Sequence, residues 1–426
     1  MSLDAWTAAT LSLSSPLSAE ALQAAQLHLL NDTIAFARQA SPFYRRLALP
    51  DVPLARISDL AQLPFTTPED LTRADPPLTA VSQSQIARIV TLPTSGTTGA
   101  PKRLHFSEAD VDAIIAYFAA GMGQFTRAGD TVVIAFPGER PGSIGDNLVA
   151  AMARLGARAV LVPWTLPPED LGRLIEAERA DVVAGPPVRM LAAARCHRPT
   201  THRVRAALLS SDRLPPPLKQ ALEDIWGAEV FDHWGMTETG LGGAVECSVH
   251  DGMHLRAPDI HAEIVDPQTG APCPDNTPGE LVITTLRRRG QPLIRYRTGD
   301  RARLDTAPCA CGSILPRLVV EGRLDAGIDM PSGRLTLATL DDILFADAAV
   351  TDFTADWSKG APPVLDICLA TASLHHATDI VPRCRQRLQA SPLIGPELAT
   401  DRLRITVRLN AEPLCQHNGK RRLTQA

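Results

Sequence analysis

The chain has 426 residues, of which 45% are hydrophobic and 21% are charged, and its formal net charge is −5. A chain of this length exceeds a single typical core, so we expect two or more domains. The slight acidic excess gives no basic surface for nucleic acid, and no apolar run approaches the roughly 20 residues that span a bilayer. The N-terminus does not resemble a secretory signal, and eight scattered cysteines do not resemble a disulfide framework. We therefore expect a cytoplasmic protein that binds neither nucleic acid nor membrane.

The expected secondary structure alternates between helices and strands. Apolar side chains recur at helical spacing over residues 19–47, where Ser41-Pro42 interrupts the run. Further helices are expected at 108–122 (capped by Ser107), 143–155 and 171–180, and strands at 89–92, 130–136, 159–163, 181–184, 206–212 and 403–409. This alternation favours an α/β fold with a mainly parallel sheet.

Parallel sheets bind ligands beyond the carboxyl ends of their strands, which places a substrate pocket there. The candidate pocket residues are Phe136, Pro137, Gly138, Gly185, Pro186, Ser210, Ser211 and Asp212. Arg140 and Arg189 lie near these ends, either as contacts for a polar substituent of the substrate or as surface arginines, which is the commoner state.

Residues 94–102 read Thr-Ser-Gly-Thr-Thr-Gly-Ala-Pro-Lys. Glycines let a backbone approach an anion closely, hydroxyls add donors, and Lys102 supplies a point charge. A flexible linker has a similar composition, but a linker does not need the closing Pro-Lys or the preceding apolar run. The spacing is not that of a Walker loop. The candidate phosphate-binding residues are Thr94, Ser95, Gly96, Thr97, Thr98, Gly99 and Lys102.

This nonapeptide resembles the phosphate loop of the adenylate-forming acyl-activating superfamily. Residues 42–46 and 63–71 are similar to the opening of its phenylacetate–CoA ligase branch. The resemblance implies a large multi-layer αβ N-terminal domain over residues 1–322, with a β-rich part near 240–320. It also implies a small mobile α+β lid over residues 323–426.

Residues 232–240 resemble the superfamily segment that holds adenine, the α-phosphate and Mg²⁺. By that resemblance Trp234 stacks on adenine, Thr237 contacts the α-phosphate and Glu238 holds Mg²⁺, which prefers carboxylates together with substrate phosphates. Core packing is the alternative role for a buried tryptophan. The other nucleotide-binding residues of this segment are Asp232, His233, Gly235 and Met236.

Three later motifs follow in the order of the family. Asp300, in Thr-Gly-Asp, takes the position that binds the ribose hydroxyls, although the tripeptide alone is an ordinary turn. Arg323 takes the position of an arginine near the nucleotide, and Asp325 that of the hinge residue. Lys420 takes the position of the catalytic lysine carried by the lid; the alternative is a solvated basic tail.

The sequence departs from the family at two places. Ser211-Asp212 stands where the family has a glycine-containing segment beside the acyl pocket, and residues 326–333 replace the usual loop of the thiol tunnel. The acceptor, CoA or the phosphopantetheine of a carrier protein, therefore stays open.

A cluster of cysteines and histidines predicts a structural Zn²⁺ site. Cys309 and Cys311 form a tight pair, and Cys247 adds a third thiol. Some members of the phenylacetate–CoA ligase branch have the same pattern, in which His254 takes the histidine position and His250 competes with it. Three thiolates and one imidazole complete a closed tetrahedral site, which stabilises and does not catalyse. The alternative is that Cys247 is a buried small hydrophobe beside a turn.

The reaction implied is ATP-dependent activation of an aromatic carboxylic acid, followed by transfer of the acyl group to a thiol. Two alternatives remain: an adenylating enzyme that uses a non-aryl acid or another oxyanion with an amine or other non-thiol acceptor, and a non-catalytic nucleotide-binding homologue. No Gly-x-Ser-x-Gly elbow is present, so a hydrolase would lack its nucleophile. The branch is common in secondary metabolism, and a monomer or a homodimer is expected.

Overall fold

The computed structural model describes residues 1–47, 49–72, 75, 77–92, 101–372, 379–410 and 421–425. The chain forms two compact units, each built from three separate stretches. Unit 1 contains Met1–Arg127, Arg140–Gly156 and Phe231–Leu324, and unit 2 contains Ala128–Glu139, Ala157–Val230 and Asp325–Ala426. Within the described part, no helix combines the length and apolar character that crossing a bilayer requires. The expected boundary between a large domain and a lid at 322/323 stays a prediction.

The helices of unit 1 begin and end where local sequence signals place them. The Oγ of Ser18 accepts a hydrogen bond from the backbone of Ala21 at the start of α2, and the helix ends at Ala40, with the extended Ser41 before Pro42. Ser107 begins α4 in a capping box with Asp110. The predicted helices at 19–47, 108–122 and 143–155 are therefore confirmed. The helices are α1 Leu3–Thr10, α2 Ala19–Ala40, α3 Pro42–Arg46, α4 Glu108–Met122 and α5 Ile144–Leu155.

The strands of unit 1 are antiparallel. Strand β1 (Ile86–Leu92) pairs with β2 (Lys102–Ser107), and the sequence did not predict the second of these strands. A larger sheet follows the order β10-β11-β12-β13-β9-β8-β7. Its strands are β7 Glu229–Trp234, β8 Ala244–Glu246, β9 Met253–Leu255, β10 Ile260–Val265, β11 Gly279–Thr285, β12 Tyr296–Asp305 and β13 Arg317–Arg323. Short 3₁₀ helices occur at η1 Ile57–Gln62, η2 Asp70–Thr72, η3 Gln83–Gln85 and η4 Thr237–Thr239.

Unit 2 contains the parallel sheet that the sequence predicted. Its order is β6-β5-β3-β4, and each neighbouring pair is parallel. The helix expected at 171–180 begins three residues earlier, because Pro168 occupies its first turn, and it ends at Ala177. The elements are β3 Thr131–Ile134, β4 Arg158–Leu161, α6 Pro168–Ala177, β5 Val182–Gly185, α7 Pro187–Cys196, β6 Ala206–Leu209 and α8 Pro216–Trp226.

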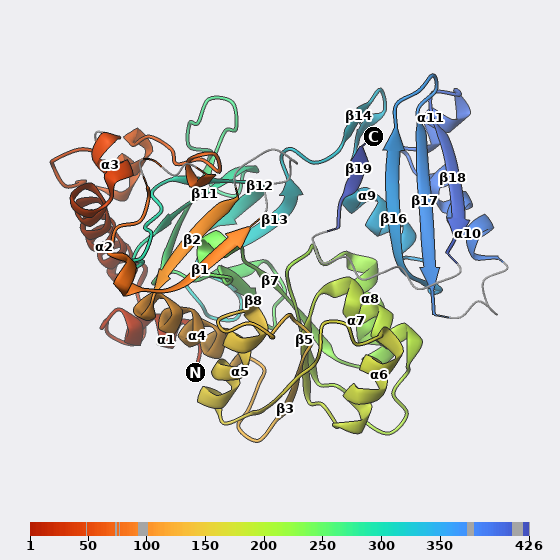
Figure 1. Ribbon diagram of the computed structural model, residues 1–426, viewed down its shortest axis with the longest axis horizontal. Coiled ribbons are helices and arrows are strands. Elements are labelled where there is room, and N and C mark those ends of the chain that lie inside the picture. Colours follow the sequence, from red (N-terminus) through yellow and green to blue (C-terminus); the bar gives the residue numbers. More distant parts are fainter. Residues whose placement is uncertain are drawn as a thin grey trace. The chain divides into compact units, whose positions relative to one another are not determined.

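The C-terminal stretch of unit 2 forms a second sheet in the order β18-β17-β16-β19, with helices of its own (Figure 1). The sequence departs from its family at residues 326–333. These residues include the two that precede β14, strand β14 itself, its turn and the first residue of β15, and the two strands pair antiparallel. The elements are β14 Ile328–Met330, β15 Gly333–Leu335, α9 Leu337–Leu344, β16 Val350–Ser358, β17 Val364–Thr371, α10 Ile380–Ala390, α11 Gly395–Ala399, β18 Arg404–Leu409 and β19 Leu423–Gln425. Strand β18 confirms the strand expected at 403–409.

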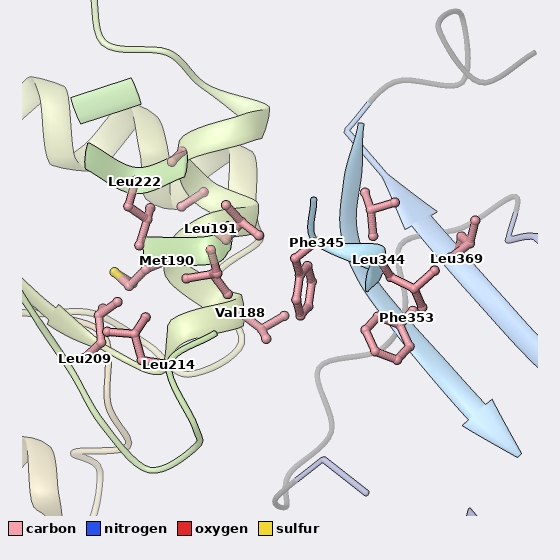
Figure 2. Close-up of a cluster of buried hydrophobic side chains, with 14 of the residues drawn as sticks. Val188, Met190, Leu191, Leu209, Leu214, Leu222, Leu344, Phe345, Phe353 and Leu369 are labelled. Carbon is pink, nitrogen blue, oxygen red and sulfur yellow. The ribbon is translucent and has the colours of Figure 1, made fainter. Parts of the chain in front are cut away.

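One hydrophobic core runs through unit 2. Val188 and Leu191 of α7 point toward Phe345, which follows α9, and Phe353 of β16 lies in the same cluster (Figure 2). Arg195, also on α7, donates hydrogen bonds to the backbone oxygens of Phe345 and Val350. The mixture of helices with parallel and antiparallel sheets confirms the α/β fold class.

Candidate functional site

Glu238 lies where donors from three distant segments of unit 1 converge. It belongs to the short helix η4, which Gly240 ends in the left-handed conformation, and it is 4% exposed. Its Oε1 accepts a hydrogen bond from the Tyr296 hydroxyl at 3.0 Å and lies 3.4 Å from Lys102 Nζ. Burial and the neighbouring carboxylate raise the pKa of Tyr296 well above its usual value, so its hydroxyl stays protonated and donates.

Arg288 holds the backbone of the same residue. Its Nη1 donates to the carbonyl oxygen of Glu238 at 2.6 Å, and its guanidinium lies 4.2 Å above the Phe106 ring. Burial lowers the pKa of Arg288 to about 10, which leaves the side chain charged at neutral pH. A buried cation therefore fixes the main chain of Glu238, while Tyr296 and Lys102 fix its carboxylate.

Trp234 and Asp300 are in direct contact. The indole Nε1 of Trp234 donates to Asp300 Oδ2 at 3.1 Å, and Arg323 Nη1 lies 3.3 Å from the other carboxylate oxygen. The pairing of β12 with β13 places Asp300 beside Arg323, because these two residues are opposite each other in the register of the strands. A side chain at Gly299 would place its Cβ 2.6 Å from the Arg323 guanidinium, so the glycine makes room for the pair.

The remaining residues of the 232–240 segment support this arrangement. Asp232 N donates to a Glu246 carboxylate oxygen at 3.0 Å. Burial lowers the pKa of His233 to about 4, so its ring is neutral at neutral pH. A Cβ on Gly235 would lie 2.2 Å from the Leu241 carbonyl oxygen, and a side chain cannot fit there. Met236 N donates to Thr239 Oγ1 at 3.1 Å, which closes the turn that contains Thr237.

Two groups of predicted residues lie outside the described residues. One is the phosphate loop from Thr94 to Gly99, and the other is the Gly419-Lys420 pair. Lys102 is described, as the first residue of β2, and its Nζ lies 3.4 Å from Glu238 Oε1. Asp325, the predicted hinge, is the first residue of the last stretch of unit 2.

The predicted pocket residues belong to unit 2, at the carboxyl ends of its parallel strands. Backbone hydrogen bonds join these ends: Ala135 N donates to Ala184 O at 2.8 Å, and Ser210 N donates to Gly185 O at 3.3 Å. Ser211 has a φ of 76°, an uncommon conformation for a residue with a side chain. The candidates after β3, β5 and β6 are thus brought together: Phe136, Pro137, Gly138, Gly185, Pro186, Ser210, Ser211 and Asp212. Of these, Phe136 is only 1% exposed.

Arg189 corrects one expectation, because it is not a surface arginine. It is 6% exposed, and its guanidinium lies 4.7 Å above the Trp164 ring. It donates hydrogen bonds to the backbone oxygens of Pro163, Trp164 and Leu166. These three carbonyls in the turn after β4 accept from a single guanidinium, whose several donors compensate for the burial of its charge. Arg140 is exposed, as expected.

Four residues of unit 1 form a cluster suited to a metal ion. The ligand atoms of Cys247, His254, Cys309 and Cys311 all lie within 4.8 Å of one another. His250 is not a member of this cluster: its Nδ1 lies 2.9 Å from a Glu246 carboxylate oxygen. Of the two histidines left open by the sequence, the geometry therefore favours His254.

The distances within this cluster fit a tetrahedral zinc site. The Sγ atoms of Cys247 and Cys309 are 3.8 Å apart, and Cys311 Sγ lies 3.4 Å from His254 Nε2. Zn–S bonds of about 2.3 Å and Zn–N bonds of about 2.0 Å imply ligand separations of about 3.8 and 3.5 Å at tetrahedral angles. His254 Nδ1 donates to the Leu315 carbonyl oxygen at 3.3 Å, which leaves Nε2 free of its proton for a metal.

Sequence reasoning did not identify Tyr296 or Arg288 as functional residues. Tyr296 lay within a quoted motif, but no local pattern showed that its hydroxyl would reach Glu238. Arg288 stands in a run of three arginines, and only the fold distinguishes it from its two neighbours.

Comparison with known proteins identifies the family of the chain. A model of the AMP-binding enzyme family matches residues 33–286, more than half of the chain. A phenylacetate–coenzyme A ligase of Aromatoleum evansii is 31% identical over 323 residues, which is 72% of each chain. A phenylacetate–coenzyme A ligase of Pseudomonas putida is 30% identical over 304 residues, 67% of each chain.

Among solved structures, a 2-hydroxyisobutyryl-CoA ligase in complex with 2-HIB-AMP superposes with a TM-score of 0.78. Its sequence is 22% identical, and the match covers 95% of this chain and 90% of that one. The chain therefore belongs to the AMP-binding enzyme family and is an AMP-forming carboxylic acid ligase.

Proposed function

We propose that this enzyme adenylates an aromatic carboxylic acid and then transfers the acyl group to the thiol of coenzyme A. The observation that carries the first step is the convergence on Glu238 of Lys102, Tyr296 and Arg288, beside the contact between Trp234 and Asp300. The aromatic acid and the CoA acceptor are supported by the relatives, which are phenylacetate–coenzyme A ligases.

In the first step a carboxylate oxygen of the acid attacks the α-phosphorus of ATP, and pyrophosphate leaves. Glu238 would hold Mg²⁺, which would neutralise phosphate charge, because Mg²⁺ is commonly bound through one or two carboxylates together with substrate phosphates. Thr237 contacts the α-phosphate, Asp300 holds the ribose hydroxyls, and Lys420 stabilises the charge that develops on the transferring groups. Direct attack needs alignment and charge neutralisation more than a protein nucleophile.

In the second step the thiol attacks the acyl carbon, and AMP leaves with the electron pair of the broken bond. The C-terminal residues beyond Asp325 turn between the two steps, as the family resemblance implies. The pocket residues after β3, β5 and β6 select the acid. Cys247, His254, Cys309 and Cys311 would hold a structural Zn²⁺, because three thiolates and one imidazole complete a closed site.

The first experiment is ATP–pyrophosphate exchange across a panel of acids that includes phenylacetate, hydroxybenzoates and short aliphatic acids. We expect exchange that depends on an aromatic acid and falls at least about 100-fold in Lys420→Ala, because charge stabilisation of this kind is worth two to three orders of magnitude. Fastest exchange with an aliphatic acid would refute the aromatic assignment. Absence of exchange with every acid would favour the nucleotide-binding homologue.

The acceptor is tested separately, because the β14–β15 hairpin occupies the stretch where the sequence departs from its family. Acyl-adenylate formed with the best acid is offered CoA, a phosphopantetheine-loaded carrier protein, or an amine. Thioester formation with CoA is expected. Faster transfer to the carrier protein or the amine would assign the enzyme to the corresponding alternative.

A further inference from the structure

Cys311 is the exposed member of the cysteine–histidine cluster in unit 1. Of the seven cysteines in the described part of the chain, it alone is exposed, whereas Cys247 and Cys309 are 8% and 4% exposed. His254, the fourth member, is 1% exposed. The cluster is therefore open to dissolved molecules on the side of Cys311.

Cys247 belongs to a separate segment and lies close to both cysteines of the turn before β13. Its Sγ is 3.8 Å from Cys309 Sγ, and the ligand atoms of all four residues lie within 4.8 Å of one another. A disulfide requires two sulfurs about 2.05 Å apart. The sulfurs of Cys247 and Cys311 are at most 4.8 Å apart, so they need to approach by less than about 3 Å to form a bond.

The backbone of the turn favours Cys247 over Cys309 as the partner of Cys311. Cys309 N donates to the Ser313 carbonyl oxygen at 2.9 Å, and Gly312 N donates to the Cys309 carbonyl oxygen at 2.9 Å. A disulfide between Cys309 and Cys311 would span a single residue and would have to fit this fixed turn, where distorted geometry stores strain. Cys247 follows β8 and takes no part in these two hydrogen bonds.

Zinc ligation would give Cys311 the properties of a reactive thiolate. A thiol that coordinates a metal ion is deprotonated, and the thiolate is the form that oxidants attack. Cysteines that sense oxidants are typically exposed thiolates beside a second cysteine that can form a disulfide with them. Cys311 meets these conditions, with Cys247 as its neighbour.

We propose that the cluster is a peroxide-responsive site, in which Cys311 is oxidised first and Cys247 then forms a disulfide with it. This inference rests on the Zn²⁺ site of the proposed function. The Cys311 thiolate attacks one oxygen of hydrogen peroxide, and the O–O bond breaks to give a sulfenic acid and hydroxide. The Cys247 thiolate then attacks the Cys311 sulfur, and the S–O bond breaks with loss of a second hydroxide. The two sulfurs together lose two electrons, which reduce one peroxide.

The disulfide removes two of the four candidate zinc ligands. Cys309 and His254 remain, and two ligands do not complete a tetrahedral site. We therefore expect zinc to be released as the disulfide forms, and a thiol reductant with added zinc to restore the site. The oxidation state of the two sulfurs thus decides whether a metal ion can join β9 to the turn before β13.

Treatment of the full-length, zinc-loaded enzyme with hydrogen peroxide tests this inference. A chromogenic chelator follows the release of zinc, and mass spectrometry of peptides maps the disulfides. About one zinc per chain should be released, at the rate at which the Cys247–Cys311 disulfide appears. Dithiothreitol and added zinc should reverse both changes.

Cys311→His separates oxidation of this residue from metal binding. Imidazole can replace the thiolate as a zinc ligand but does not form a sulfenic acid, so the variant should retain zinc and release it at least about 10-fold more slowly in peroxide. Cys273→Ser is the matched control, because Cys273 belongs to unit 1 but lies outside the cluster. It should release zinc at the rate of the unmodified enzyme.

Three results overturn the inference: an unchanged rate of release in Cys311→His, a disulfide that involves Cys309, or oxidation of Cys311 to a sulfinic acid without any disulfide. If Cys311→His does not retain zinc, the disulfide map of the unmodified enzyme decides. A purified enzyme without zinc would refute the proposed metal site, and the inference with it. A zinc-containing enzyme that forms no disulfide would refute the inference alone.

Discussion

Single hydrogen bonds hold the Glu238 carboxylate in the position that its proposed role requires. The Tyr296 hydroxyl is a buried donor that cannot exchange its partner for water, and Arg288 holds the main chain of the same residue. Such charge-assisted hydrogen bonds contribute about 1.5–3 kcal/mol each. We therefore treat Tyr296 and Arg288 as positioning residues for Glu238.

Removal of one hydroxyl tests the role of Tyr296. Tyr296→Phe should lower the rate of pyrophosphate exchange by about 10-fold or more, because about 1.4 kcal/mol corresponds to a factor of ten. The control is Tyr117→Phe, which removes a buried hydroxyl that has no hydrogen-bond partner among the described residues. That control should exchange normally and unfold at the same temperature or slightly higher. Equal rates in both variants would contradict the role of Tyr296.

Asp341 gives the stability of the protein a distinctive pH dependence. Burial raises the pKa of Asp341 from 3.8 to about 6, against the opposing effect of Arg421. Between pH 4 and pH 6 the folded state therefore binds more protons at this site than the unfolded state, so its contribution to the free energy of unfolding falls as pH rises. The full change corresponds to about 3 kcal/mol.

Asp341→Asn removes this titration. The free energy of unfolding of the unmodified protein minus that of the variant should decrease by up to about 3 kcal/mol between pH 4 and pH 6.5. Urea denaturation at several pH values measures it. A difference that stays constant or rises with pH would show that Asp341 does not titrate in this window.

At the scale of elements, the cysteine–histidine cluster lies where the neighbouring strands β8, β9 and β13 meet the turn before β13. His254 lies on β9, Cys247 directly follows β8, and Cys309 and Cys311 stand in the turn before β13. Gly312, with a φ of 90°, closes that turn, and its N–H donates to the Cys309 carbonyl oxygen at 2.9 Å. A bound zinc ion would join these three segments at one point.

Cys311→Ser should remove this metal. We expect zinc to fall from about one per chain to near zero, and the unfolding temperature to fall by roughly 5 °C or more, since 1 kcal/mol shifts a domain of this size by about 2–4 °C. Mass spectrometry and thermal unfolding measure the two quantities. Cys273→Ser is the control, because Cys273 is outside the cluster and should keep its metal. An unchanged zinc content in Cys311→Ser would show that this cluster does not bind the metal.

At the scale of the whole molecule, the chain passes from unit 1 to the last stretch of unit 2 between Leu324 and Asp325. Leu324 N donates to the Gly299 carbonyl oxygen at 2.9 Å, so unit 1 holds the chain up to this point. Gly327, two residues beyond Asp325, has a φ of 115° that other residues rarely adopt. The expected hinge thus lies at the boundary between the two units.

A proline at the hinge should separate the two half-reactions. Asp325→Pro fixes φ near −65° at the residue that must rotate, so we expect one half-reaction to persist within about threefold and the other to fall at least about 10-fold. Asp325→Ala, which leaves the backbone free, should support both. Pyrophosphate exchange measures the first half-reaction and thioester formation from acyl-adenylate measures the second. Equal losses in both half-reactions would contradict a hinge at Asp325.

The sequence by itself determined the helices with clear caps, the parallel strands and the family to which the chain belongs. These features are local: Ser107 begins α4 through a hydrogen bond to a residue three positions away, and apolar periodicity marks the strands of the parallel sheet. The motif of residues 232–240 could also be recognised, because it is a continuous local pattern.

Only the tertiary structure decided which distant side chains meet. Tyr296 and Lys102 reach Glu238 from 58 and 136 positions away, His254 joins the cysteines while His250 turns to Glu246, and Arg189 is buried against three carbonyls. Hydrogen bonds and burial depend on the packing of separate segments, and no local pattern encodes such packing. Hence the motifs that resemble those of the family could be recognised in the sequence, whereas the distant residues that hold them in place could not.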